Sequence, residues 1–355
     1  MIERRHQWLL DCWTLVAKQR ATRPDEYASS VVQRATVRCP FCRGHEADTL
    51  ESLSLYGASA DPDRWDVRVT PNKFPALQPF SAAPDDEATS ATDALIPASP
   101  YAQGSTAGVH ELVIESPEHC SRFSDLTEDQ ARFTAHAWRD RLRQYATDPR
   151  LAYGLVFRNS GLAGGASLEH VHSQIICTPW IPSVVRTELR QFQRWRELRG
   201  GCVLCAMVRE ELQHGRRFVA QTSNLLAFCP YASRFAWETW IVPRQHASCF
   251  EQSSDELTAE LGQLLRQLLP KIEGLAKLRG YNLWIHTAPF ATASASANAG
   301  ANAGASASAE DSLGFHWHLE IAPRTTGTAG FETGGGDYII SISPEDAADY
   351  LRLDR

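Results

Sequence analysis

Two Cys-x-x-Cys pairs, each followed by histidines, are the residues of this sequence best suited to chemistry. The first pair is Cys39-Pro-Phe-Cys42 and the second is Cys202-Val-Leu-Cys205; a lone histidine and then a His-x-His triplet follow each pair. Two thiolates and two imidazoles form the kind of four-coordinate set that binds zinc. A single Cys-x-x-Cys is weak evidence, but the repetition of the whole pattern favours metal binding over coincidence.

The two His-x-His triplets also predict which side chains share a face. His170, His172 and Gln174 are spaced by two residues, so in an extended strand all three point to one side. One imidazole can then bind metal while the next faces a substrate. A neutral imidazole can attack phosphorus and form a covalent phosphoramidate, and the amide of Gln174 can donate hydrogen bonds to oxygens that gain charge. His316, His318 and Glu320 repeat this spacing in the second half.

A glycine-rich turn at 161–167 lies just before the first triplet. Such a turn offers backbone N–H groups to a phosphate, although it is equally well explained as a tight turn alone. Arg20 and Arg23 have the guanidinium groups that suit phosphate recognition. Their spacing by itself, however, favours ordinary solvated surface.

The positions of these motifs indicate an internal duplication. In both halves a glutamate and the lone histidine are 8 residues apart, and a tyrosine follows that histidine after 34 or 35 residues. The tyrosine precedes the triplet by 17 residues in the first half and by 35 in the second. A low-complexity Ala/Ser/Asn/Gly segment at 291–309 accounts for the difference. Two fused copies of one module are the simplest explanation.

Each module is predicted to be α+β. The segments 111–119 and 238–246 are typical of buried strands that end in a proline-containing turn. Capping residues near 124 and 253 begin helices that end near Tyr145 and Leu278. We therefore predict two domains, 1–195 and 196–355, each a mostly antiparallel sheet with a helix across it. The segments 81–108 and 291–309 are predicted to be flexible insertions without chemistry.

Composition excludes several classes of protein. The chain has 35 Lys and Arg against 42 Asp and Glu, a net charge of −7, which argues against binding nucleic acid by bulk charge. No apolar run approaches the roughly 18 residues of a membrane helix, so no membrane span is expected. The N-terminus is a poor signal peptide, and nine cysteines without such a signal predict a cytoplasmic protein.

Taken together, the ordered motifs resemble the galactose-1-phosphate uridylyltransferase family, a branch of the histidine-triad superfamily. The resemblance covers nearly the whole chain, from WTLVAKQRATRP through CPFC, NKFPAL, ESPEH and HVHSQ to GFETGGG. It implies two fused histidine-triad-like modules and a homodimer whose sites borrow residues from the partner. It also implies a ping-pong reaction, in which a nucleotidyl group passes from a nucleotide-sugar to a histidine, sugar 1-phosphate leaves, and a second phosphate takes the nucleotide.

The resemblance also implies roles for individual residues. The nucleophile falls on His172, with Val171 in place of the family's proline, and a second catalytic residue falls on Gln174. The implied first zinc site consists of Cys39, Cys42, His119 and His170. The implied substrate contacts are Arg20, Arg23, Asn72, Phe74, Asn159, Ser167, Phe331 and Glu332.

The second metal site and the base of the nucleotide stay open at this point. Some uridylyltransferases have a second site of one Glu and three His, and Glu188 matches that glutamate. Members that resemble the ADP-glucose phosphorylase of plants have cysteines there, as this chain does. We expect zinc, with iron as the alternative, and leave the role of His318 open; the expected ligands are Cys202, Cys205, His246 and His316.

The leading interpretation is a UDP-glucose–hexose-1-phosphate uridylyltransferase of galactose metabolism. Lys73 stands where some uridylyltransferases have an acidic ribose contact, so the base is not determined. The alternatives are an ADP-glucose:phosphate adenylyltransferase (phosphorylase), a dinucleotide hydrolase, and a non-catalytic zinc-stabilised nucleotide-binding protein.

Overall fold

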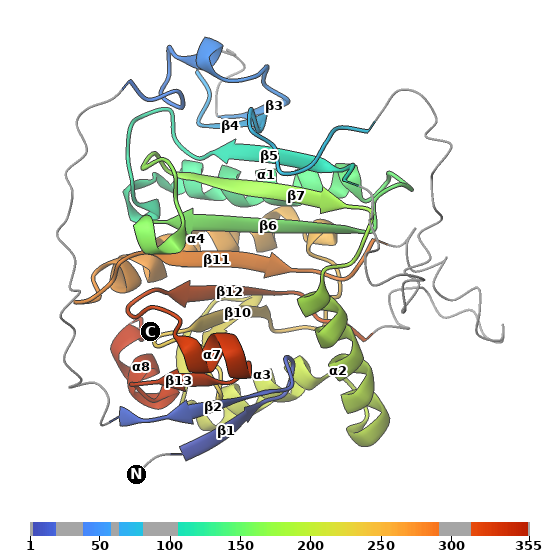
Figure 1. Ribbon diagram of the computed structural model, residues 1–355, viewed down its shortest axis with the longest axis vertical. Helices are drawn as coiled ribbons and strands as arrows, with labels where there is room; N and C mark the ends of the chain where they lie inside the picture. Colours follow the sequence, from blue (N-terminus) through green and yellow to red (C-terminus); the bar gives the residue numbers. More distant parts are fainter. Residues whose placement is uncertain (1–2, 19–37, 58–63, 81–105, 291–313, 354–355) are drawn as a thin grey trace.

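The computed structural model describes residues 3–18, 38–57, 64–80, 106–290 and 314–353 (Figure 1). Arg20, Arg23 and the low-complexity segment 291–309 lie outside the described residues, as does most of the predicted insertion 81–108. No helix in the described part of the chain is long and apolar enough to cross a membrane.

A ten-stranded antiparallel sheet runs through the middle of the molecule, in the order β3-β4-β5-β7-β6-β11-β12-β10-β9-β8. The first half of the chain supplies β3 (Ser54–Tyr56), β4 (Val67–Pro71), β5 (Val109–Ile114), β6 (Tyr153–Ser160) and β7 (His172–Thr178). The second half supplies β8 (Phe218–Gln221), β9 (Leu225–Phe228), β10 (Thr239–Pro243), β11 (Tyr281–His286) and β12 (His318–Pro323).

The two halves join edge to edge, because β6 pairs with β11. The predicted α+β class with a mostly antiparallel sheet is confirmed. The predicted division at residue 195 falls inside helix α2 (Ser183–Arg199), and the sheet is continuous across both halves. The division into two modules therefore stays an interpretation of the sequence repeat.

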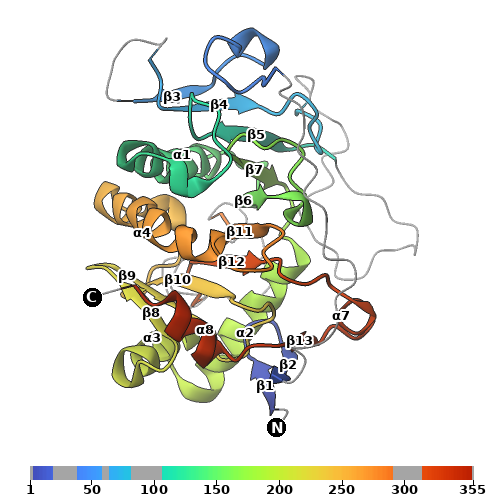
Figure 2. The same cartoon turned by 90° about the vertical axis from the view of Figure 1, so that its left-hand side faces the viewer.

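One helix from each half covers the same face of the sheet. These are α1 (Glu128–Tyr145) and α4 (Asp255–Glu273), which lie side by side (Figure 2). Thr127 caps α1 through a capping box and Ser254 caps α4, so both helices begin with satisfied N–H groups. A Cβ on Gly262 of α4 would lie only 2.4 Å from the carbonyl oxygen of Ala131 in α1, so glycine permits this close approach.

Among the described residues, α-helices cover the opposite face only beside the strands of the second half. There α2 and α3 (Val203–His214) contribute Val185, Phe192 and Val208 to an apolar cluster with Phe228 and Trp240. As a result β9, β10 and β12 are buried at every position, whereas β6 and β7 alternate between buried and half-buried residues. Strands that are covered on both faces have mostly apolar residues at successive positions, and the segment 239–243 has this pattern.

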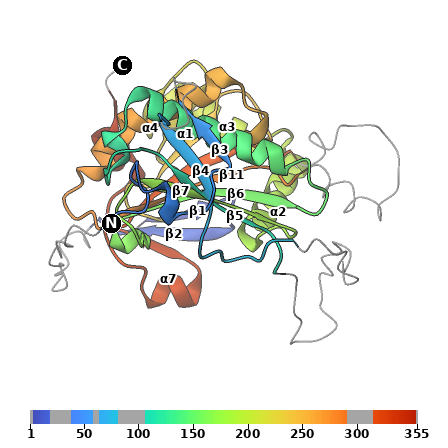
Figure 3. The same ribbon diagram turned by 90° about the horizontal axis from the view of Figure 1, so that it is seen from above.

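A smaller sheet combines strands from the two ends of the chain. It has the order β1-β2-β13, formed by β1 (Glu3–Gln7), β2 (Cys12–Val16) and β13 (Tyr338–Ile340). Helices α7 (Gly330–Gly335) and α8 (Pro344–Leu351) flank β13 in sequence. Seen from above, α7 projects from the side of the molecule opposite α1 and α4 (Figure 3).

Candidate functional site

A single row of side chains links the two His-x-His strands across the sheet. Gln174 of β7 is paired with Phe157 of β6, Phe157 with Trp284 of β11, and Trp284 with Glu320 of β12. Directly paired residues lie on the same face, so Gln174 and Glu320 share one face about 14 Å apart, which is three strand spacings. The duplicated motif thus presents two similar constellations to one side of the sheet.

Helix α2 closes one of these constellations and leaves the other open. Its Glu188 accepts a hydrogen bond from Nδ1 of His286 at 2.9 Å, directly over the second triplet. His318 is fully buried there, while His172 keeps 6% exposure and Gln174 is half-buried. Among the described residues, Gln174 of the first constellation is thus more exposed than its counterpart Glu320 in the second.

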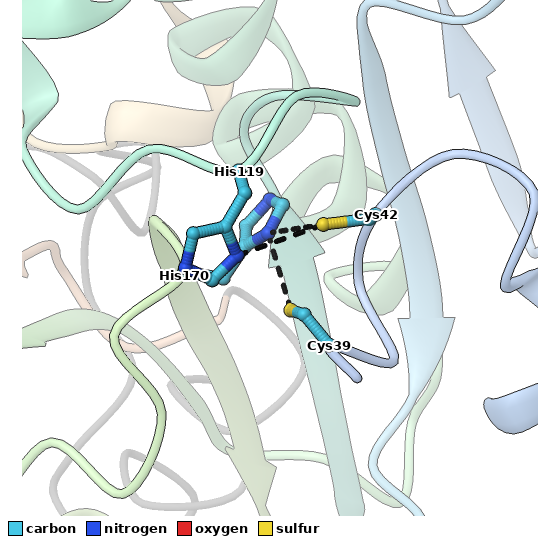
Figure 4. A group of neighbouring side chains, drawn as sticks. All are labelled: Cys39, Cys42, His119 and His170. Atoms are coloured by element: carbon cyan, nitrogen blue, oxygen red, sulfur yellow. Dashed lines mark hydrogen bonds between the residues drawn. The ribbon is translucent and has the colours of Figure 1, made fainter. Parts of the chain in front are cut away.

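The first predicted metal set converges at the end of β7 (Figure 4). The Cys39 sulfur lies 3.4 Å from Nδ1 of His170, and the Cys42 sulfur lies 3.6 Å from Nδ1 of both His119 and His170. Tetrahedral zinc with its usual bond lengths separates sulfur and nitrogen ligands by about 3.6 Å. Nε2 of His170 donates to the carbonyl oxygen of Ser116 at 2.8 Å, which leaves Nδ1 free for a metal. The donor set fits zinc.

The second predicted set comes together in the same way. The Cys202 sulfur lies 3.7 Å from Nδ1 of His316, and the Cys205 sulfur lies 3.5 Å from Nδ1 of His246 and of His316. All four ligand atoms lie within 4.8 Å of one another. The structure therefore brings together the eight residues that the sequence grouped into two sets, and His318 belongs to neither.

His318 belongs instead to a buried acidic group whose members come from three separate elements of the chain. Its Nε2 lies 3.3 Å from Glu320 and 3.8 Å from Glu188, and His286 completes the group. Burial opposes the charge on His318, but hydrogen bonds to the two carboxylates outweigh it and raise its pKa to about 10. Arg234 binds the other oxygen of Glu320. A proton on His318 balances the negative charge of the two carboxylates, and a divalent cation bound in place of that proton would do the same. The signal in the sequence was the position of Glu320, four residues after His316, which places it on the same face of the strand as His318.

His172, the predicted nucleophile, has a neutral ring whose orientation is fixed by its contacts. Its Nδ1 donates to the carbonyl oxygen of His170 at 2.7 Å, so the lone pair of the neutral ring is on Nε2. Burial lowers the pKa of His172 to about 4, which keeps the ring neutral near pH 7. The ring of Phe41, from the Cys-x-x-Cys loop, packs edge-on against it with centroids 5.2 Å apart. The loop of the predicted metal ligands Cys39 and Cys42 therefore also contacts His172.

Two further residues connect the predicted contacts. His110 of β5 lies between Gln174 and Asn72, 2.8 Å from Oε1 of Gln174 and 3.1 Å from Nδ2 of Asn72. Asn282 of β11 donates to Oδ1 of Asn159 at 2.8 Å. Neither residue could be predicted from the sequence, because each acts through a strand that is distant in the chain.

The glycine-rich turn is needed for packing. A Cβ on Gly164 would lie 2.7 Å from the carbonyl oxygen of Tyr281, and Gly161 has a φ of 70°. Asn282 also donates to the carbonyl oxygen of Gly164 at 2.7 Å. These contacts explain the glycines as a tight turn against β11; a role in phosphate binding stays a prediction. Ser167 lies exposed in the same loop.

The remaining predicted contacts are dispersed. Phe74 is 84% exposed beside Asn72. Phe331 and Glu332 belong to α7, in the other half of the molecule from β7 (Figure 1). Glu332 lines a cavity of about 950 Å³ together with Arg279 and other residues of the second half. Within the described residues, the first half thus gathers the predicted nucleophile and the predicted nucleotide contacts, and the predicted hexose contacts lie elsewhere.

Several known proteins are similar to this chain in sequence and in fold. Residues 1–182 match the family described as galactose-1-phosphate uridyl transferase, N-terminal domain. The ADP-glucose phosphorylase of Arabidopsis thaliana is 30% identical over 96% of this chain and 89% of its own. The galactose-1-phosphate uridylyltransferase of Thermotoga maritima is 26% identical over 99% of this chain and 98% of its own.

A solved structure extends this likeness to three dimensions. The crystal structure of an ADP-glucose phosphorylase from Arabidopsis thaliana with bound ADP-glucose is 28% identical to this chain. It matches 100% of both chains with a TM-score of 0.78. The resemblance predicted from the motifs is confirmed, and the chain belongs to the galactose-1-phosphate uridylyltransferase family.

Proposed function

We propose that this protein transfers a nucleotidyl group from a nucleotide-sugar to a phosphate acceptor through a covalent intermediate on His172. The observation that carries the proposal is the presentation of His172. Its ring is neutral, Nδ1 donates to the backbone, no described residue is hydrogen-bonded to Nε2, and the ring lies on the same face of the sheet as the half-buried Gln174. The second triplet offers no comparable group, because α2 covers it.

In the first step, Nε2 of His172 attacks the α-phosphorus of the nucleotide-sugar and forms a P–N bond. The bond from phosphorus to the bridging oxygen breaks, and sugar 1-phosphate leaves with its electron pair. In the second step, a phosphate oxygen of the acceptor attacks the same phosphorus and the P–N bond breaks. Both the leaving group and the acceptor are phosphate oxyanions, so neither step needs a proton to move.

The surroundings of His172 suit this chemistry. The modified ring carries positive charge, which the hydrogen bond from Nδ1 to the carbonyl oxygen of His170 stabilises. Gln174 and Asn159 supply polar groups on the same face for the phosphate and the nucleotide. We include Arg20, Arg23, Asn72, Phe74 and Ser167 in the proposed binding site, as the family resemblance implies.

Zinc is the proposed metal for both Cys/His sets, one ion in each. When bound, it supplies a structural cross-link and no chemistry to the transfer. In the first set, Cys39 and Cys42 thereby fix the loop that carries Phe41 and the backbone of His170. This fixation orients the His172 ring.

The leading donor is UDP-glucose, with galactose 1-phosphate as the acceptor. The family match and the named uridylyltransferase relatives support this choice. The second candidate is ADP-glucose with inorganic phosphate as the acceptor. Two observations favour it: the identity with an ADP-glucose phosphorylase, and the Cys202 and Cys205 ligands in the second metal set.

We also propose a homodimer in which α7 of one subunit completes the site of the other. Phe331 and Glu332 lie on a projecting helix in the other half of the molecule from β7, which supports a task outside their own subunit's site (Figure 3). Light scattering after gel filtration tests the assembly. A monomer that retains full transfer activity would contradict it.

The experiment for the reaction is intact-mass spectrometry after brief incubation with one nucleotide-sugar and no acceptor. A uridylyl adduct from UDP-glucose, absent in His172→Asn, supports the leading function. An adenylyl adduct from ADP-glucose alone keeps the mechanism and changes the donor. The proposal fails if no adduct and no burst of sugar 1-phosphate form with either.

A further inference from the structure

His110 holds the side chain of Gln174 from a neighbouring strand. It is half-buried in β5, opposite Ile176, and therefore lies diagonally next to Gln174 on the same face of the sheet. Three groups surround its ring. The backbone nitrogen of Ala76 lies 3.0 Å from Nδ1, while Oε1 of Gln174 and Nδ2 of Asn72 lie 2.8 Å and 3.1 Å from Nε2.

These contacts determine which ring nitrogen carries the proton. A backbone N–H can only donate, and its direction is set by the chain, so Nδ1 of His110 must accept from Ala76. The neutral ring then carries its hydrogen on Nε2. This N–H needs an acceptor, and two side-chain amides are within reach.

Of these two amides, only that of Gln174 can be the acceptor. The oxygen of Asn72 is already turned away from the ring, because Oδ1 accepts from the backbone N–H of Phe74 at 2.9 Å. The amide oxygen of Gln174 therefore faces His110. Since an amide has its oxygen and its NH₂ on opposite sides, the NH₂ group of Gln174 faces away from His110.

We infer that His110 is a positioning residue that turns Gln174 so that its NH₂ group, and not its oxygen, meets the phosphate of the nucleotide. Phosphate oxygens accept hydrogen bonds, so a reversed amide would place an oxygen against them and repel the substrate. This inference rests on the proposed function, because it assigns His110 a task in nucleotidyl transfer.

Two substitutions separate this task from a purely structural one. Asparagine at 110 places an oxygen near the position of Nδ1, so it keeps the bond from Ala76 and loses the donor to Gln174. Glutamine at 110 places an NH₂ near the position of Nε2, so it keeps the donor and loses the bond from Ala76. The two variants are matched in polarity and each retains one of the two hydrogen bonds.

The measurement is the single-turnover rate of nucleotidyl-enzyme formation, with UDP-glucose and ADP-glucose as the probes. His110→Asn is expected to slow this step by about 10- to 100-fold, the range that a misplaced catalytic group costs. His110→Gln is expected to recover most of the rate. In a Gln174→Ala background, adding His110→Asn should change the rate by less than about threefold, since a residue that acts only through Gln174 has nothing left to position.

Zinc content and thermal unfolding of each variant serve as controls for folding, and His214→Asn, at the exposed end of α3, is the matched control for loss of a histidine. The inference is overturned if His110→Asn reacts at the wild-type rate. It is also overturned if His110→Gln is as slow as His110→Asn, or if the losses from Gln174→Ala and His110→Asn multiply.

A second readout needs no activity. Nitrogen-15 NMR of the histidine rings, assigned by the loss of one signal in His110→Gln, reports which nitrogen carries the proton. The Nε2–H tautomer is expected, and the Nδ1–H tautomer overturns the inference even in an active enzyme. A wild-type protein that forms no adduct but shows the Nε2–H tautomer overturns the proposed function and leaves the orientation of Gln174 supported.

Discussion

Nδ1 of His172 donates to the carbonyl oxygen of His170, at 2.7 Å, while Nδ1 of His170 faces the sulfurs of the first metal set. The proposed nucleophile is thus oriented by the backbone of a metal ligand. The Phe41 ring, which lies between the two cysteines in the chain, packs against both imidazoles. Loss of the metal should therefore change the orientation of the His172 ring, although His172 is not one of the metal ligands.

Removal of the first zinc should abolish transfer. Cys42→Ser is expected to lose one zinc per chain and to slow nucleotidyl-enzyme formation by about 100-fold, because misplacing a reacting group by about 1 Å costs that much. Metal content by mass spectrometry and the single-turnover rate are measured together. Cys205→Ser is the matched variant in the second set, and should lose one zinc while keeping the rate within about threefold. Equal losses of rate in both variants would contradict the link between His170 and His172.

The two His-x-His triplets should differ in function. His172→Asn is expected to retain zinc and to form no adduct, since the attacking Nε2 is gone. His318→Gln should still form the adduct, but lower the free energy of unfolding by about 3 kcal/mol, because it removes a buried positive charge between Glu188 and Glu320. Denaturant unfolding and intact mass test the pair. An adduct on His318 would contradict the assignment.

Transfer should persist in acid. Burial lowers the pKa of His172 to about 4, so the reactive neutral ring dominates down to about pH 5 and is lost as the pH approaches 4. The rate of the burst of sugar 1-phosphate, followed by rapid quench at a series of pH values from 7.5 to 4.5, measures this directly. A burst rate that halves near pH 6.5, the value of an ordinary histidine, would show that the ring is not shielded.

This lowered pKa also affects stability. The unfolded chain binds a proton at His172 near pH 6.5, whereas the folded chain does not bind one until about pH 4. The contribution of His172 to stability is therefore present above pH 6.5 and is lost as the pH falls toward 4. In His172→Asn, the free energy of unfolding should fall less between pH 7 and pH 5 than in the wild type.

The contact between α1 and α4 should depend on Gly262. Alanine there would place a methyl group 2.4 Å from the carbonyl oxygen of Ala131, and overpacking of this kind costs about 1–3 kcal/mol. Gly334→Ala is the control, because nothing lies within 4 Å of a Cβ at that position. Thermal unfolding compares the two. Equal midpoints would show that the helices can move apart at no cost.

Much of the site follows from residue types and short spacings. Two-residue spacing puts His172 and Gln174 on one face of any extended strand, and thiol and imidazole chemistry selects zinc for Cys39 and its partners. The duplication, read from matched spacings, predicted two metal sets and an antiparallel α+β architecture. These features depend on local geometry and ligand chemistry, which the chain carries whatever it packs against.

Other features depend on which distant segments meet. The His-x-His triplet occurs twice, and α2 lies over His318, so that Glu320 is buried while Gln174 on the matching strand is half-buried. The roles of His110 and Asn282 likewise arise from strand pairing across β5–β7 and β6–β11. The sequence determined which groups could do the chemistry; the tertiary structure decided which of the two similar strands keeps a partly exposed polar side chain beside its His-x-His triplet, because burial is set by long-range packing that no local periodicity encodes.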